Sequence, residues 1–187
     1  MKLDRNEILR YMRMGRAVPD AALSTRIDAL EKEVLAAARP RHVVRSERVS
    51  CRRVGESAEV TVGPLTFGSL DLARCLQDAP RAYLLAATLG HDVDRLLRRY
   101  GATSAADLLI VQAVAATAVE QYIDEVELTL DGPRTPRFSP GYGDLPLSVQ
   151  PDFLAAVDAQ KTLGITLTDT CLMIPSKSVT AIIGVLS

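Results

Sequence analysis

The sequence predicts an α+β domain in which a mostly antiparallel, twisted sheet is flanked by helices. Segments with helical spacing and segments rich in β-branched residues are interleaved along the chain, and several strand-like segments lie close enough together to form hairpins. Hydrophobic residues make up 48% of the 187 residues and aromatic residues only 4%, so the core is expected to be sizeable and aliphatic. We expect residues 1–40 to form an N-terminal helical extension and residues 41–187 to form the α+β domain.

The N-terminal segment is expected to contain two helices. Asp4 and Glu7 have the spacing of a capping box, and Gly15 is suited to ending the first helix. Pro19-Asp20 opens the second helix, which continues to Pro40. Its apolar residues recur at helical spacing: Leu23, Ile27, Leu30, Val34 and Leu35.

The remaining elements follow from apolar periodicity and from breaker residues. We predict strands at 42–49, 58–62, 82–89, 165–170 and 179–186, and helices at 69–78, 91–100, 105–126 and 150–164. Gly101 is expected to end the helix at 91–100, and Ser104 to cap the next one. The apolar run from Leu108 to Val119 contains Gln112 and is too short to span a bilayer, so we interpret it as part of a buried helix.

Charge and composition exclude several classes of function. The chain has 22 basic and 23 acidic residues, so it offers no strong field of one sign to nucleic acid or to a membrane. No apolar run follows the N-terminus, and we therefore expect a cytoplasmic protein without a signal peptide. The cysteines and histidines are isolated, so we predict neither a metal site nor a catalytic triad: Cys51, Cys75, Cys171, His42 and His91.

The segment Arg137–Asp144 carries the strongest functional signal. Arginine presents a planar fork of donors that fits a carboxylate, and Gly141 lets backbone come close to a ligand. Tyr142 offers a flat ring for stacking. These groups suit a small zwitterion with a ring, such as an amino acid joined to a nucleoside. The alternative is a surface turn in which Arg137 pairs with Asp131 or Asp144.

This segment, R-x-S-P-G-Y, resembles the R-x-A-P-G-Y signature of the activation domain of cobalamin-dependent methionine synthase, which binds S-adenosylmethionine. A second block, Leu163–Thr180, is similar to the family pattern G-(hydrophobic)-x-L-T-x-x-x-x-M-x-P-x-x-S-V. Both blocks occur in the family's order, with a helix between them. The likeness is clear over about residues 105–187.

The resemblance implies a set of residues that contact or orient S-adenosylmethionine: Glu120, Asp131, Arg137, Ser139, Gly141 and Tyr142. Arg137 would bind the methionine carboxylate, and Tyr142 would stack on adenine or close the pocket. Glu120 would offset a positive charge of the ligand, although Asp124 lies one turn later on the same helix face. Asp131 would orient Arg137.

Two positions depart from the family pattern. Gly143 stands where the family usually has proline, which predicts a looser loop. No counterpart of a further family strand, which supplies another tyrosine, follows Ser187. We therefore expect a binding face that is open on one side.

The implied function is that of a subunit that binds S-adenosylmethionine and supports reductive methylation of cob(II)alamin. The cobalamin would be carried by a corrinoid-binding methionine synthase chain that lacks its own activation domain, and a flavoprotein would donate the electron. Two alternatives stay open: a docking module for a corrinoid protein without tight cofactor binding, and a domain that binds another nucleotide.

Overall fold

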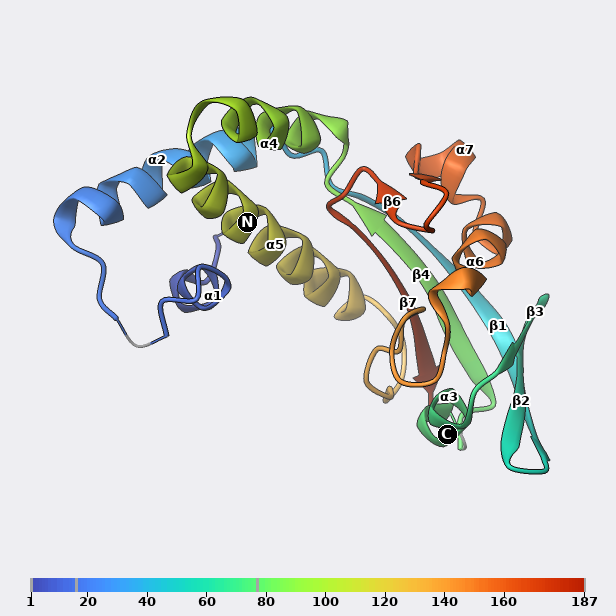
Figure 1. The fold of residues 1–187 in the computed structure, drawn as a ribbon. Helices are drawn as coiled ribbons and strands as arrows, with labels where there is room; N and C mark the ends of the chain where they lie inside the picture. Colours follow the sequence, from blue (N-terminus) through green and yellow to red (C-terminus); the bar gives the residue numbers. More distant parts are fainter. Residues whose placement is uncertain (1, 16, 77, 187) are drawn as a thin grey trace. The chain divides into compact units, whose positions relative to one another are not determined.

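The structure is a computed structural model that describes residues 2–15, 17–76 and 78–186. It contains a curled antiparallel sheet of five strands with flanking helices (Figure 1), which confirms the predicted α+β class. The described residues fall into two compact units. Unit 1 takes those within Met1–Arg41, Thr88–Thr129 and Pro175–Lys177, and unit 2 takes those within His42–Ala87, Leu130–Ile174 and Ser178–Ser187.

Unit 1 is helical. Its helices are α1 (Arg5–Tyr11), α2 (Ala21–Ala37), α4 (His91–Thr103) and α5 (Ala105–Glu127). Side-chain oxygens of Asp4, Asp20 and Ser104 accept backbone N–H groups in the first turns of α1, α2 and α5, which confirms these caps. The Glu7 half of the predicted capping box is wrong, because Glu7 accepts from Arg10 while the Asp4 N–H donates to Gln121. Helix α1 ends at Tyr11, before Gly15. Gly101, predicted to end a helix, instead lies inside α4, which continues until Ser104 takes an extended conformation.

Helix α5 forms the centre of unit 1. It packs against α1, α2 and α4, and Arg26 of α2 holds Asp107 of α5 through two hydrogen bonds of 2.7 and 2.6 Å. By length and composition α5 is apolar enough to cross a membrane, but half of its most apolar window is buried within the protein. The predicted buried helix is therefore confirmed. The N-terminal helices share a unit with α4 and α5, and the boundary at residue 40 stays a prediction.

Unit 2 contains most of the sheet. Its strands are β1 (Arg41–Val54), β2 (Ser57–Val62), β3 (Leu65–Gly68), β4 (Arg81–Thr88) and β7 (Ser178–Val185), in the order β3-β2-β1-β4-β7. The hairpin of β1 and β2 closes with Val54 opposite Ser57, so β1 extends beyond the strand predicted at 42–49. The short strand β3, which the sequence analysis missed, pairs antiparallel with β2.

The core of unit 2 lies between the sheet and the helices α3 (Leu70–Leu76), α6 (Gln150–Ala156) and α7 (Ala159–Leu163). Figure 1 shows α6 and α7 on one side of the sheet. Alternate residues of β2 face the core, so Ala58, Val60 and Val62 are buried. Phe153 of α6 is fully buried among them. A short 3-10 helix, Leu147–Val149, precedes α6.

Two predicted elements after residues 137–144 are also wrong in extent. The helix predicted at 150–164 is divided into α6 and α7, because Asp158 adopts a left-handed conformation with φ 53°. The strand predicted at 165–170 is only β5 (Thr166–Leu167), paired with β6 (Met173–Ile174). The chain turns back after β5 because the Thr168 hydroxyl accepts the Leu172 N–H at 3.1 Å.

Candidate functional site

The segment before the motif loop lies along the edge of β7. Phe138 and Ile182 exchange backbone hydrogen bonds of 2.9 and 2.7 Å, and the Thr135 N–H donates to the Gly184 carbonyl at 3.0 Å. A side chain at Gly184 would not fit there, since its Cβ would lie 2.8 Å from Thr135 Cγ2. The sheet edge therefore fixes the start of the motif loop.

The motif loop, residues 137–144, closes on itself through backbone hydrogen bonds. The Tyr142 N–H donates to the Ser139 carbonyl at 3.0 Å, and the Gly141 N–H donates to the Leu145 carbonyl at 2.8 Å. Gly141 has φ 91° and Gly143 has φ 51°, both in the region that favours glycine. Gly141 therefore has a backbone conformation that favours glycine, whereas its predicted approach to a ligand stays a prediction. Leu145 is buried at the end of the loop.

Tyr142 lies at the surface. The residue is 58% exposed, and its ring meets Phe138 edge to face with centroids 6.3 Å apart. Phe138 in turn packs against the core of unit 2. The ring is therefore held at its base and open on its outer side, which suits stacking with a planar ligand group.

Asp144 joins the motif loop to α3. Its carboxylate accepts the Ser69 hydroxyl, the Leu70 N–H at 2.7 Å and the Asp71 N–H at 3.3 Å. Negative charge at a helix N-terminus is favourable. The hydrogen bond from Ser69, with help from the backbone N–H groups, holds the pKa of Asp144 below its usual value. Asp144 therefore works as a helix cap.

The remaining predicted site residues line none of the four pockets described below. Arg137 and Ser139 are half-buried and Asp131 is exposed, all in unit 2. The Asp131 carbonyl accepts the Tyr83 hydroxyl at 3.5 Å. Glu120 is half-buried on α5 and belongs to unit 1, as does the alternative, Asp124. The six assignments stay predictions.

A neighbouring arginine has a structural role. Arg134 Nη1 donates to the Gly132 carbonyl at 3.1 Å and to the Leu130 carbonyl, and so holds the turn that leads to the motif loop. An Arg134 variant is consequently a poor control for Arg137, because it would loosen the approach to the same loop. Arg52 is a better control in the same unit, since it is exposed and pairs only with Glu59 among the described residues.

The second motif block, residues 163–180, consists mostly of short strands and turns. It supplies β5, β6 and the start of β7, and Ser176 donates from its N–H and its hydroxyl to Asp94, the hydroxyl at 2.7 Å. Burial lowers the pKa of Lys177, while the nearby Asp94 charge opposes this shift.

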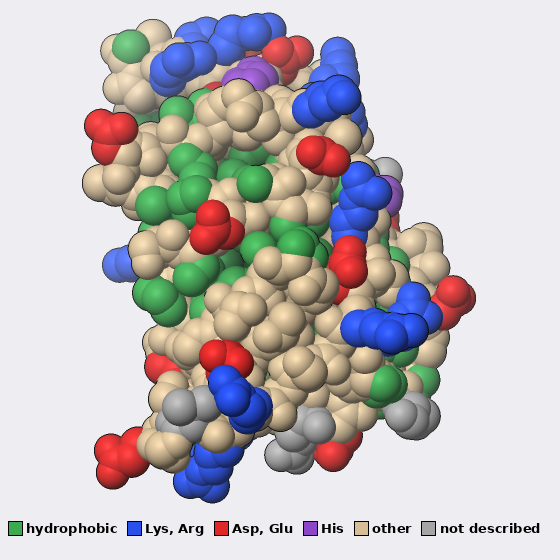
Figure 2. All heavy atoms as spheres, turned by 90° about the vertical axis from the view of Figure 1, so that its right-hand side faces the viewer, with side chains coloured by type: hydrophobic (Ala, Val, Ile, Leu, Met, Phe, Trp, Pro, Cys, Tyr) green, Lys and Arg blue, Asp and Glu red, His purple; other side chains and the backbone are tan. Residues whose placement is uncertain are grey.

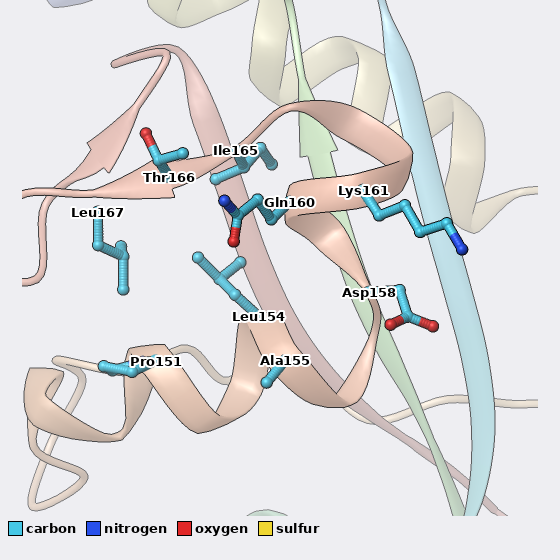
Figure 3. Close-up of a pocket in the computed structure, with 9 residues that line it drawn as sticks. All are labelled: Pro151, Leu154, Ala155, Asp158, Gln160, Lys161, Ile165, Thr166 and Leu167. Carbon is cyan, nitrogen blue, oxygen red and sulfur yellow. The ribbon is translucent and has the colours of Figure 1, made fainter.

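The largest of four described pockets lies elsewhere in unit 2, between α6, α7 and β5 (Figure 3). It measures about 780 Å³. Its lining residues are Pro151, Leu154, Ala155, Asp158, Gln160, Lys161, Ile165, Thr166 and Leu167. The candidate site at the motif loop stays a prediction, and neither Arg137 nor Tyr142 lines this pocket. The open binding face predicted at this loop also stays a prediction.

The surface carries both basic and acidic side chains. Figure 2 shows Lys and Arg side chains next to Asp and Glu side chains on one face. Within residues 2–15, 17–76 and 78–186, no group of three or more His, Cys, Asp or Glu side chains is placed to hold a metal ion. The cysteines are free thiols, with Cys51 exposed.

Comparison with known proteins supports the fold. No protein-family model matches this chain, and no curated protein sequence matches it. Among solved structures, the chain is similar to the crystal structure of the MetH reactivation domain bound to AdoHcy. The TM-score is 0.62 at 17% sequence identity, and the match covers 98% of this chain and 70% of the other. At that identity the similarity shows that the two proteins share a fold.

Proposed function

We propose that this chain is an S-adenosylmethionine-binding subunit that supports reductive methylation of cob(II)alamin. The methylated cobalamin would belong to a cobalamin-dependent methionine synthase or a related corrinoid protein. The observation that carries the proposal is the shared fold with a reactivation domain that was crystallised with AdoHcy. AdoHcy is what S-adenosylmethionine becomes once its methyl group has been transferred.

The motif loop has the groups that such a ligand needs. Arg137 is half-buried and follows directly from the segment fixed along β7, so its guanidinium is suited to a carboxylate. Tyr142 presents an open ring face for adenine. The positive φ at Gly141 exposes the backbone between them without a side chain. S-adenosylmethionine therefore fits the chemistry of the residues present.

The contribution of this chain would be binding and orientation. When bound, S-adenosylmethionine supplies the methyl group. Arg137 would fix the amino-acid end and Tyr142 the adenine end, so that the rest of the ligand faces the cobalamin of a partner. Neither residue needs to donate or accept a proton in this role.

The partners are inferred from the same chemistry. A corrinoid-bearing synthase chain would present the cobalamin, and a flavoprotein would supply the electron that cob(II)alamin needs before methylation. The exposed Tyr142 is compatible with a large second molecule covering the loop. The same exposure favours the alternative proposal, a docking module that contacts a corrinoid protein without binding S-adenosylmethionine tightly.

A reconstitution experiment tests the proposal. The chain is mixed with a methionine synthase that carries cob(II)alamin, together with S-adenosylmethionine and a reductant, and the absorption spectrum is followed. The proposal predicts that the methylcobalamin spectrum returns faster with this chain than without it. A rate that is unchanged by the chain, with S-adenosylmethionine at saturation, would contradict it.

A further inference from the structure

The start of α3 touches the motif loop at one further place. Asp71 is the second residue of α3, and its carboxylate lies against the backbone of Gly143. A Cβ built on Gly143 would lie 2.5 Å from Asp71 Oδ2 and 3.2 Å from Asp71 Cγ. Because Gly143 directly follows Tyr142, the packing places a negative charge next to the loop.

Asp71 and Asp144 differ in how many of their carboxylate oxygens accept hydrogen bonds. Asp144 uses both oxygens to cap α3. Asp71 Oδ1 accepts from Arg74 Nη1 at 2.9 Å, whereas no hydrogen bond engages Asp71 Oδ2 among the described residues. The Asp71 side chain is 41% exposed. Of these two carboxylates, only Asp71 has an oxygen that no hydrogen bond engages among the described residues, and this oxygen lies beside Gly143.

We propose that Asp71 is a further ligand-binding residue and that its carboxylate binds the α-ammonium group of S-adenosylmethionine. This inference rests on the proposed function. The amino-acid end of the ligand carries a carboxylate and an ammonium group on the same carbon, so a site that takes the carboxylate with Arg137 must face the ammonium as well. An ammonium donates hydrogen bonds that a carboxylate accepts strongly, while a sulfonium has no N–H to donate.

The test compares Asp71→Asn with the unmodified chain by calorimetric titration. Three ligands are used: S-adenosylmethionine, S-adenosylhomocysteine, and the deamino analogue of S-adenosylhomocysteine, which keeps the carboxylate but lacks the ammonium. Asp71→Asn should weaken binding of the first two ligands by about tenfold, since the contact is charge-assisted but partly exposed. It should leave binding of the deamino analogue within about twofold, because that ligand has no ammonium to lose.

Two control variants separate a ligand contact from a structural effect. Arg74→Gln removes the partner of Asp71 Oδ1 and keeps the carboxylate, so binding should not weaken. Glu59→Gln removes a carboxylate of similar exposure, 44%, from the exposed pair with Arg52. This variant should bind all three ligands as the unmodified chain does. If Arg74→Gln weakens binding as much as Asp71→Asn, the effect comes from the ion pair and the inference is wrong.

The outcomes also separate this inference from the proposed function. Suppose that the unmodified chain binds S-adenosylmethionine and that the Asp71→Asn variant binds all three ligands with the same affinities as the unmodified chain. Only the role of Asp71 is then refuted. Equal weakening for all three ligands, or weakening for S-adenosylmethionine alone, likewise overturns the ammonium contact. If the unmodified chain binds none of the ligands, the proposed function itself is refuted and the inference falls with it.

Discussion

Replacing Asp144 with alanine tests whether the motif loop is held against α3 as described. The variant removes the acceptor of the Ser69 hydroxyl and of the Leu70 and Asp71 N–H groups. Ser69 is fully buried, so its hydroxyl would lose a partner that water cannot readily replace. Loss of a helix cap with one buried donor left unsatisfied is expected to cost about 1–2 kcal/mol.

The measurement is thermal unfolding followed by circular dichroism, at pH 7 and at pH 3. A loss of about 1–2 kcal/mol should lower Tm by about 2–8 °C in a chain of this size. The pKa of Asp144 is lowered in the folded protein, so the carboxylate stabilises the fold above its unfolded-state pKa. This contribution is lost as the pH falls through the folded-state pKa, and the difference between variant and unmodified chain should therefore shrink at pH 3.

Two results would refute this reasoning. An unchanged Tm at pH 7 would show that the capping contacts contribute nothing. A Tm difference that is as large at pH 3 as at pH 7 would show that the carboxylate charge is not responsible. Asp144→Asn provides the matched variant, because it keeps one carbonyl acceptor and should lose less stability than Asp144→Ala.

Three further predictions concern the loop and the core. Arg137→Ala should weaken S-adenosylmethionine binding by about 1.5–3 kcal/mol in calorimetry, whereas Arg52→Ala should not; equal losses would show that the site is misplaced. Tyr142→Ala should slow the return of the methylcobalamin spectrum without lowering Tm, since the ring is largely exposed, and a large drop in Tm would contradict this. Thr180→Val should cost about 1–3 kcal/mol in urea unfolding, because Gln150 would lose its 2.8 Å hydrogen bond while buried.

Most of the fold was predictable from local signals. The caps at Asp20 and Ser104 each predicted the start of a helix, and the apolar run at 82–89 predicted a strand. Each of these signals lies within or next to the element itself. The errors occur where the backbone conformation does not follow from the local sequence. Gly101 lies within a helix that it was predicted to end. The helix predicted after Gln150 is interrupted at Asp158, and no sequence pattern predicted the left-handed conformation of that residue.

The candidate site was predictable in part. The sequence indicated the motif loop and its glycine turn, and φ at Gly141 agrees. It gave no sign that residues before Phe138 pair with β7, because that contact joins segments far apart in the chain. It likewise gave no sign of Asp71, which lies against Gly143 in the folded protein.

The binding of S-adenosylmethionine by the unmodified chain is the central claim, and isothermal calorimetry measures it most directly. The account predicts saturable binding of S-adenosylmethionine and S-adenosylhomocysteine, with no comparable binding of ATP. At about a hundredfold excess over Kd, either ligand should stabilise the fold by about 2.7 kcal/mol and raise Tm by about 5–10 °C. No heat and no shift in Tm with either ligand, or equal binding of ATP, would contradict the claim.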